Sequence, residues 1–235
     1  MAEPIHFDEF AIDYDIALAQ GLSATGEEKE YFARGRVAWL AQLLRKLGEH
    51  PQHVMDYGCG TGSTTKILLD SIEPEYVLGV DNSAKSIELA RRTFSSEKIN
   101  FQLLGERRPP EQMDLVYCNG VFHHINPNDR GAALEFVWSC LKPGGLFALW
   151  ENNPWNPGTR FVMSRTPFDR DAIPLSPLQA QKLVRSRFDI LRSDYLFIFP
   201  RLLKWLRPFE RLVSRVPVGG QFQILCRKAF SSSRE

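Results

Sequence analysis

Short apolar runs alternate with amphipathic stretches along most of the chain, which predicts strands that alternate with helices. Apolar runs of strand length predict strands at 54–56, 76–81, 99–104, 113–118, 146–150, 188–199 and 221–227. Helical spacing of apolar residues, or a polar cap, predicts helices at 27–47, from 63 onward, 84–94, 126–141 and 178–186. The alternation favours an α/β fold with a mostly parallel sheet, helices on both faces, and a ligand at the carboxyl ends of the strands.

The stretch 54–62 joins the first of these strands to the helix that follows it. Apolar residues lead into Asp56, and glycines then stand at the alternate positions 58, 60 and 62, which indicates a turn too tight for side chains. A helix N-terminus directly behind such a loop forms an anion-binding corner. A dinucleotide fingerprint, Gly-x-Gly-x-x-Gly, needs a third glycine at position 63, where Ser63 stands instead.

The second buried strand also ends in an acidic residue, Asp81, which lies 25 residues after Asp56. In a doubly wound fold, a carboxylate at this place meets ribose hydroxyls, because it accepts two hydrogen bonds from a diol. Asn82 and Ser83 follow it and cap the next helix. Two strands that end in acids, with a glycine loop between them, are more specific for such a ligand than either feature alone.

Composition narrows the class of protein. With 235 residues, 43% of them hydrophobic, the chain can bury one sizeable core, and we expect a single domain over 1–235. The net charge of +1 carries no overall signature of nucleic-acid binding. The four cysteines form no Cys-x-x-Cys pair, which suits reduced thiols better than disulfides or a zinc site. Because no apolar run reaches about 18 residues, we expect a cytoplasmic protein.

Asp56 and the alternate glycines resemble the glycine-rich motif of the class I S-adenosylmethionine (SAM) dependent methyltransferases, whose loop cradles the methionine end of the cofactor. The string Leu-Lys-Pro-Gly-Gly-x-Phe at 141–147 is a further signature of this family. The resemblance is strong over about 50–150. It implies a Rossmann-like, seven-stranded sheet with an antiparallel last strand, SAM as the methyl donor, S-adenosylhomocysteine as the product, and no metal.

The resemblance also implies roles for individual residues. The implied cofactor-binding residues are Asp56, Gly58, Cys59, Gly60, Gly62, Asp81, Asn82, Glu106 and Asn119. Among them, Glu106 stands where the family places a contact to the adenine amine, and Asn119 opens the segment beside the reactive sulfonium. The candidate general bases are His124, His123 and Glu151. Packing and hydrogen bonding within the loop remain the alternative explanation of the histidine pair.

Residues 151–177 follow the fifth expected strand and break the regular pattern. They contain five prolines interleaved with polar and aromatic side chains, which is too rich in functional groups for a simple connection. We expect this segment to face the substrate or to form a lid, with Asn152, Asn153 and Trp155 as substrate-binding residues.

Residues 1–48 are expected to form an N-terminal cap and a helix. Four residues of the cap resemble a family segment that folds over the cofactor: Phe7, Ala11, Tyr14 and Asp15. On the helix, Arg34 and Arg36 point away from most of the apolar stripe. We expect them on a solvated face, and the alternative is that one of them reaches the cofactor carboxylate.

Residues 200–217 form a long basic insertion between the last two expected strands. Its apolar residues can share one helix face and its basic residues lie largely opposite, although Pro208 must kink or restart the helix. Residues 176–235 carry twelve Lys and Arg against four Asp and Glu. Three interpretations stay open: peripheral contact with the inner face of an anionic membrane, packing on the protein's own domain, and a homodimer interface.

Together these observations predict a SAM-dependent methyltransferase of a small molecule or of a lipid- or glycan-linked intermediate, with oxygen as the methylated atom. The segments 153–169 and 206–210 resemble bacterial methyltransferases that act on such acceptors. A nucleic-acid substrate is disfavoured, because the chain has no Asn-Pro-Pro-Tyr-like motif and no basic stripe beside the active face. The alternatives are a non-catalytic binding subunit of this fold and a nicotinamide-dependent oxidoreductase.

Overall fold

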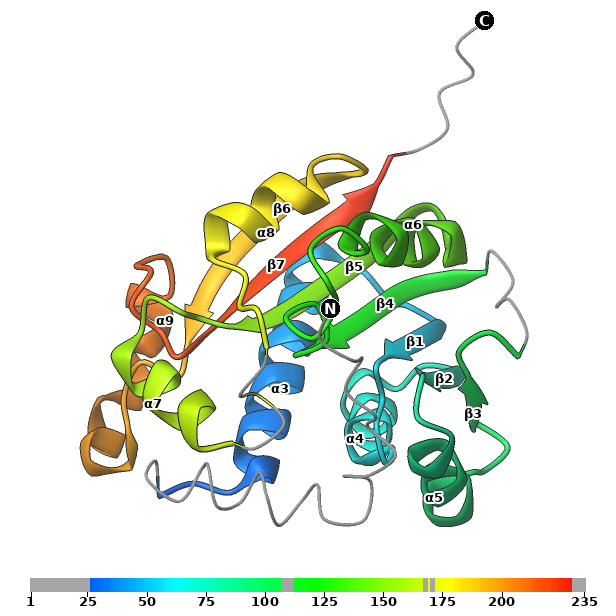
Figure 1. The fold of residues 1–235 in the computed structure, drawn as a ribbon, viewed down its shortest axis with the longest axis horizontal. Helices are drawn as coiled ribbons and strands as arrows, with labels where there is room; N and C mark the ends of the chain where they lie inside the picture. The colour runs from blue at the N-terminus through cyan, green and yellow to red at the C-terminus, as the bar shows by residue number, and fades with distance from the viewer. Residues whose placement is uncertain (1–25, 107–111, 167–168, 170–171, 230–235) are drawn as a thin grey trace, which may run out of the picture.

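The computed structural model describes residues 26–106, 112–166, 169 and 172–229, which fold around one seven-stranded sheet (Figure 1). The strands lie side by side in the order β3-β2-β1-β4-β5-β7-β6. Their bounds are β1 His53–Tyr57, β2 Tyr76–Asp81, β3 Ile99–Leu103, β4 Met113–Asn119, β5 Leu141–Asn152, β6 Phe188–Leu196 and β7 Gln221–Lys228. Only β7 runs antiparallel to its neighbours, so the fold expected from the sequence is confirmed.

Helices cover both faces of this sheet (Figure 1). Their bounds are α3 Lys29–Leu47, α4 Ser63–Ile72, α5 Ala84–Phe94, α6 Arg130–Cys140, α7 Pro157–Arg165, α8 Pro177–Val184, the 3-10 helix η3 Arg201–Phe209 and α9 Glu210–Val213. The apolar residues of α3 and α4 pack on one face, and those of α6 and α8 pack on the other. A smaller cluster joins α5 to β3. Alternate residues of each central strand therefore pack in the apolar clusters on opposite faces of the sheet.

The order of the strands reverses between β1 and β4. β2 and β3 lie on the β1 side of this point, and β5, β7 and β6 lie on the β4 side. The loops after β1 and β4 leave the sheet at its carboxyl edge, which is where a doubly wound fold leaves a crevice for a ligand. The cavities described below open at this edge.

The expected helix at 126–141 is shorter in the structure, because it begins at Arg130. The side chain of Asn126 accepts a hydrogen bond from the backbone N–H of Asn128, and the N–H of Asp129 donates to the Asn126 carbonyl. This local turn uses the groups that would otherwise start the helix. The sequence pattern does not show it, because Asn and Pro also precede true helices.

Two strand boundaries also differ from the expected ones. β5 is longer than 146–150 and includes the Lys-Pro-Gly-Gly turn, because Leu141 already pairs with Met113 before a register shift. β6 ends at Leu196 rather than at residue 199, because Phe197 adopts a left-handed conformation with φ 60° and the chain leaves the sheet.

The expected N-terminal cap, with Phe7, Ala11, Tyr14 and Asp15, lies outside the described residues. Within the described part of the chain, none of the helices has the length and apolar character that crossing a bilayer requires.

Candidate functional site

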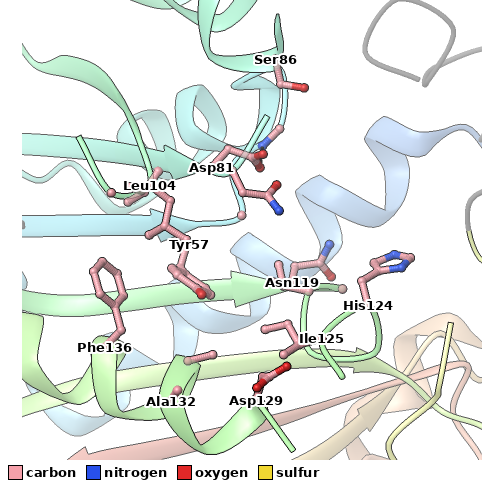
Figure 2. A pocket seen from close by; sticks show the side chains of 18 of the residues that line it. Tyr57, Asp81, Ser86, Leu104, Asn119, His124, Ile125, Asp129, Ala132 and Phe136 are labelled. Carbon is pink, nitrogen blue, oxygen red and sulfur yellow. Dashed lines mark hydrogen bonds between the residues drawn. The ribbon is translucent and has the colours of Figure 1, made fainter. Parts of the chain in front are cut away.

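Two cavities adjoin at the carboxyl edge of the sheet. The first cavity, of about 550 Å³, lies over the ends of β1, β2 and β4 and is lined by residues between Tyr57 and Phe136 (Figure 2). The second cavity, of about 410 Å³, lies among α3, α7 and the segment 197–200. Asn119, Gly120 and His124 line both cavities. Groups bound in the two cavities would therefore meet beside the loop that follows β4.

The glycine loop forms one wall of the first cavity. Gly58, Gly60 and Gly62 all have positive φ, between 53° and 87°, a conformation that side chains disfavour. A Cβ on Gly58 would lie 2.2 Å from a methyl carbon of Val121, so the loops after β1 and β4 approach closely only because residue 58 has no side chain. Gly58 and Gly60 line the cavity, whereas Gly62 packs against the ring of Phe101.

Asp81 connects the end of β2 to this loop. Its Oδ2 accepts a hydrogen bond from the Gly60 N–H at 2.8 Å, and its Oδ1 accepts one from the Ser83 N–H at 2.9 Å. Asp81 and Asn82 both line the first cavity (Figure 2). Because a carboxylate has about four acceptor positions, Asp81 can hold the loop and still accept hydrogen bonds from a bound diol.

Two residues of the motif lie beneath the loop rather than on the cavity wall. Asp56 is 2% exposed and accepts a hydrogen bond from the Thr65 hydroxyl at 2.7 Å, which ties β1 to α4. Burial raises the pKa of Asp56 to about 7. Cys59 is also buried, among the apolar residues of α5 and β3. Neither side chain lines the first cavity, and the cofactor-binding role expected of these two residues stays a prediction.

Glu106 also lies outside the lining of the first cavity, so its expected contact with the adenine amine stays a prediction. Its carboxylate accepts hydrogen bonds from the Arg91 guanidinium and the Leu103 N–H, both at 3.1 Å, and it does not line the first cavity. Leu104 and Gly105 line the cavity there instead. The wall that sequence reasoning missed is largely apolar and is formed by Tyr57, Leu104, Ile125, Ala132, Ala133 and Phe136 (Figure 2). In the sequence, these apolar residues cannot be distinguished from residues of the hydrophobic core.

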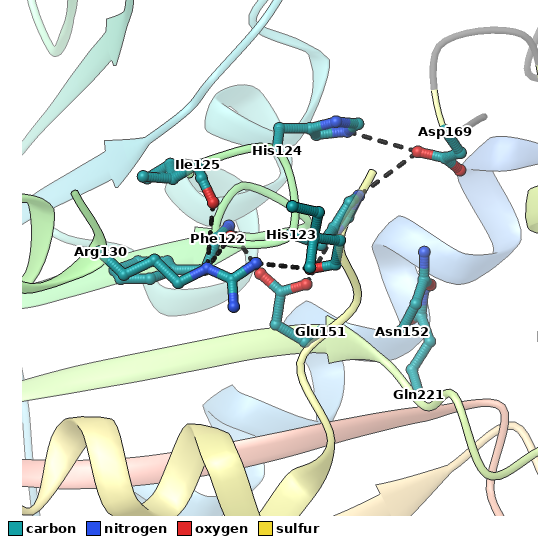
Figure 3. Close-up of polar contacts among 10 residues, drawn as sticks. Phe122, His123, His124, Ile125, Arg130, Glu151, Asn152, Asp169 and Gln221 are labelled. Carbon is teal, nitrogen blue, oxygen red and sulfur yellow. Dashed lines mark hydrogen bonds and ion pairs between the residues drawn. The ribbon is translucent and has the colours of Figure 1, made fainter. Parts of the chain in front are cut away.

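A buried triad of charged groups lies below the loop after β4 (Figure 3). His123 Nδ1 lies 2.6 Å from Glu151 Oε2, and His123 Nε2 lies 3.3 Å from Asp169 Oδ1. Burial alone would lower the pKa of His123, but the Glu151 charge and the hydrogen bonds to both carboxylates outweigh it and raise the pKa to about 10. His123 is therefore protonated at neutral pH.

The same contacts weigh against the general-base roles expected of His123 and Glu151, which stay predictions. A protonated imidazole has no lone pair with which to accept a proton. Glu151 is 1% exposed, lines neither cavity, and accepts hydrogen bonds from His123 and from the Phe122 N–H at 2.8 Å. Both side chains thus hold the loop in place, because their acceptor and donor groups are already used within the protein.

His124 differs from its neighbour. It lines both cavities, and its Nε2 lies 3.3 Å from Asp169 Oδ1 (Figure 3). Burial lowers the pKa of His124 below its usual 6.5, so the ring is neutral at pH 7 and able to accept a proton. Asp169, which sequence reasoning missed, orients both histidines.

His123, His124 and Asp169 are also close enough together to hold a metal ion. In the structure, the two ring nitrogens of His123 lie against Glu151 and Asp169 instead.

Arg130 holds the same loop from the α6 side. Its Nε donates to the carbonyls of Phe122 and Ile125, at 2.9 and 3.0 Å, and its Nη2 donates to the carbonyl of Ile173 (Figure 3). The loop that carries His124 is therefore fixed from two sides, by Glu151 and by Arg130.

The second cavity contains a buried arginine. Arg36 is 6% exposed, and its hydrogen bonds go to neutral groups: Nε to the Tyr117 hydroxyl at 3.2 Å and Nη1 to Gln221 Oε1 at 2.9 Å. Arg36 thus lies against a cavity rather than on a solvated face, whereas Arg34 is exposed and pairs with Glu30. A buried guanidinium beside a cavity suits an anionic ligand, because a charge is costly to bury without an opposite charge.

The expected substrate-binding residues separate into two groups. Asn152 lines the second cavity and accepts a hydrogen bond from Gln221 Nε2 at 3.0 Å. Asn153 is fully buried and donates to the Gly219 carbonyl at 2.8 Å, and Trp155 is half-exposed and lines neither cavity. In their place, the wall includes Asn156, which caps α7, and Gly158, Thr159, Phe161, Val162 and Met163 of α7 itself.

The sequence matches the family described as a methyltransferase domain over residues 55–147. It is 28% identical over 119 residues to a trans-aconitate 2-methyltransferase of Rhodopseudomonas palustris, which covers 51% of this chain and 46% of that protein. It is also 28% identical over 159 residues to a carboxy-S-adenosyl-L-methionine synthase of Campylobacter curvus, covering 66% of this chain and 64% of the relative. The chain thus spans about half to two thirds of the length of these relatives.

Solved structures share the fold. A putative methyltransferase in complex with the Haloferax volcanii Trm112 methyltransferase activator superposes with a TM-score of 0.65, at 19% identity, over 99% of this chain and 100% of the other. The N-methyltransferase NodS of Bradyrhizobium japonicum, solved with S-adenosyl-L-homocysteine, superposes with a TM-score of 0.58, at 12% identity, over 81% and 85%.

Proposed function

Because the chain belongs to the class I SAM-dependent methyltransferases, with SAM as its cofactor, we propose that it transfers the methyl group to an oxygen atom of an anionic small molecule or of a lipid- or glycan-linked acceptor. The observation that carries this proposal is the pair of cavities that adjoin at Asn119, Gly120 and His124. One cavity suits the cofactor and the other suits the acceptor.

The residues of the first cavity fit the cofactor. The glycine loop leaves the space that a Cβ would fill, and the Asp81 carboxylate lines the cavity, where it suits ribose hydroxyls as hydrogen-bond donors. The apolar wall that includes Tyr57 and Phe136 suits a flat aromatic ring. Arg36 lines the adjoining second cavity and, in this proposal, holds the carboxylate of the methionine end. SAM, when bound, supplies an activated methyl group, so this chain's residues mainly orient the acceptor and exclude water.

The second cavity favours a negatively charged acceptor. Beyond Arg36, which we assign to the cofactor, its charged lining residues include two ion pairs, Arg207 with Glu27 and the protonated His123 with Asp169. Lys29 adds a further positive charge, so the remaining lining is net positive. A carboxylate or phosphate oxygen needs no base, because it is already ionised. For a hydroxyl acceptor, neutral His124 would take the proton while Asp169 holds the ring.

The first experiment is calorimetric titration with S-adenosylhomocysteine and, in parallel, with NADH. Micromolar binding of the first compound alone is expected. NADH binding alone would refute the proposal, and binding of neither would favour a non-catalytic subunit whose site needs a partner. The Asp81→Ala variant should bind S-adenosylhomocysteine about 1.5–3 kcal/mol more weakly, the scale of lost hydrogen bonds to a charged group. Asp70→Ala, on the exposed side of α4, is the matched control and should bind normally.

Acceptor chemistry is tested by methyl transfer from labelled SAM to a panel of carboxylic acids, phosphates and alcohols. We expect transfer to anionic compounds first. His124→Ala should slow transfer to a hydroxyl strongly and transfer to a carboxylate little. An enzyme that prefers cationic amines would overturn the assignment of an anionic, oxygen-bearing acceptor.

A further inference from the structure

The insertion between β6 and β7 exposes an unusual amount of apolar surface. Leu202 is 89% exposed, Leu212 81% and Trp205 67%. Among the described residues, these are three of the four most exposed large apolar side chains, and Phe209, at 54%, follows them. Single exposed apolar residues are ordinary, but several within one short segment indicate an interaction surface. We call residues 201–216 the apolar platform.

Polar contacts explain why the apolar side chains point outward. Arg207 donates to Glu27 at 2.8 Å and to the Phe199 carbonyl at 3.3 Å, and Arg201 donates to the Gly26 carbonyl at 2.7 Å. Glu210 accepts a hydrogen bond from the Ile198 N–H at 2.6 Å. The platform is thus attached to the domain largely through its polar groups. This contradicts packing on the protein's own core through the shared apolar face.

The charges of the platform select one kind of partner. Lys204, Arg211 and Arg215 are exposed among the apolar residues, whereas the single acidic residue of the segment, Glu210, is turned toward the domain. A second copy docked through the same face would bring like charges together. An anionic bilayer instead accepts leucine and tryptophan at its interface and attracts long basic side chains to its headgroups.

We propose that the apolar platform docks the protein on a bilayer that contains anionic lipids, with Leu202, Trp205 and Leu212 inserted among the headgroups. Phe199, Pro200 and Arg207, at the base of the platform, also line the second cavity. Docking therefore brings the second cavity close to the lipid surface. The docking itself does not depend on the methyl transfer proposed above.

The test is co-sedimentation of the full chain with phosphatidylcholine vesicles and with vesicles that also contain phosphatidylglycerol. We expect binding to the anionic vesicles that weakens with salt. Leu202→Glu and Leu212→Glu should each reduce it by at least about tenfold, since a buried leucine is lost. The matched control is Leu178→Glu on α8, which is 65% exposed and outside the platform; it should bind like the unmodified protein.

The charge contribution is tested separately. Lys204→Gln and Arg211→Gln should each weaken binding to anionic vesicles about fivefold. Absence of vesicle binding by the unmodified protein, equal loss in the Leu178→Glu control, or equal binding to neutral vesicles would each overturn the proposal. A dimer that light scattering detects and that Leu212→Glu dissociates would do so as well, because it would identify a second copy as the occupant. None of these measurements needs cofactor or acceptor, so failure here leaves the proposed function intact.

Discussion

The buried triad of His123, Glu151 and Asp169 allows a quantitative prediction for the variant Glu151→Gln. Glutamine keeps the volume of the side chain and can still accept the hydrogen bond from the Phe122 N–H. It removes the negative charge 2.6 Å from His123 Nδ1, and among the described residues Asp169 then remains as the one carboxylate in contact with the ring. The variant should therefore lower the pKa of His123 and destabilise the folded protein.

The size of the effect follows from the pKa of His123, which the fold raises from 6.5 to about 10. At about 1.4 kcal/mol per pKa unit, the whole shift corresponds to about 5 kcal/mol of stability. Because the folded-state pKa is the higher one, this contribution is fully present below pH 6.5 and is lost as the pH rises through 10. Asp169 remains in the variant, so we expect a loss of about 3 kcal/mol at pH 6.

The assay is urea unfolding of both proteins at pH 6, 8 and 9.5. The difference in free energy of unfolding should be largest at pH 6 and should shrink as the pH approaches 10. Glu135→Gln is the control, because Glu135 pairs with Arg187 at 2.8 Å on the half-exposed surface, and it should change stability by less than about 1 kcal/mol. A difference that is absent at pH 6, or constant over the range, would refute the charged triad.

Three further predictions concern the cavities. Gly58→Ala should abolish binding of S-adenosylhomocysteine and lower stability by several kcal/mol, because its Cβ would meet Val121 at 2.2 Å; Gly48→Ala, also at positive φ but with open space around it, should cost only about 1 kcal/mol in urea unfolding. Arg36→Met should leave stability unchanged or slightly raised, since the guanidinium is buried beside neutral partners, yet weaken S-adenosylhomocysteine binding at least tenfold by calorimetry. His124→Ala should leave that binding nearly unchanged while lowering turnover of a hydroxyl acceptor, and equal turnover of that acceptor would make His124 structural.

The sequence alone predicts those elements whose structure depends on residues close together in the chain. β2 and α5 lie within the bounds expected from apolar runs and the Ser83 cap, and the glycine loop lies where the alternate glycines indicate a tight turn. These features depend on residues that are neighbours in the chain. They could be predicted because strand length, helix capping and positive φ each leave a direct mark on the sequence.

The charge states and partners of the site could not be predicted in this way, because they depend on residues far apart in the chain. Arg36 meets Gln221, 185 positions away, and the sequence alone placed it on a solvated face. His123 is protonated because two carboxylates raise its pKa: Glu151, from β5, and Asp169, from the segment after α7. Residues 201–216 have the expected apolar and basic spacing, but ion pairs to distant residues such as Glu27 decide which face is covered.

The two cavities are built from different parts of the chain. Among the described residues, those that line the first cavity all lie within the matched domain, 55–147, whereas those that line the second lie outside it except for Asn119, Gly120, His123 and His124. Apart from Arg36, which we assign to the carboxylate of the methyl donor, residues around the acceptor can therefore be substituted without changing those that bind the donor. This separation makes the second cavity a natural place to redesign selectivity: α7 and residues 197–200 could be exchanged between relatives while the donor half is kept unchanged.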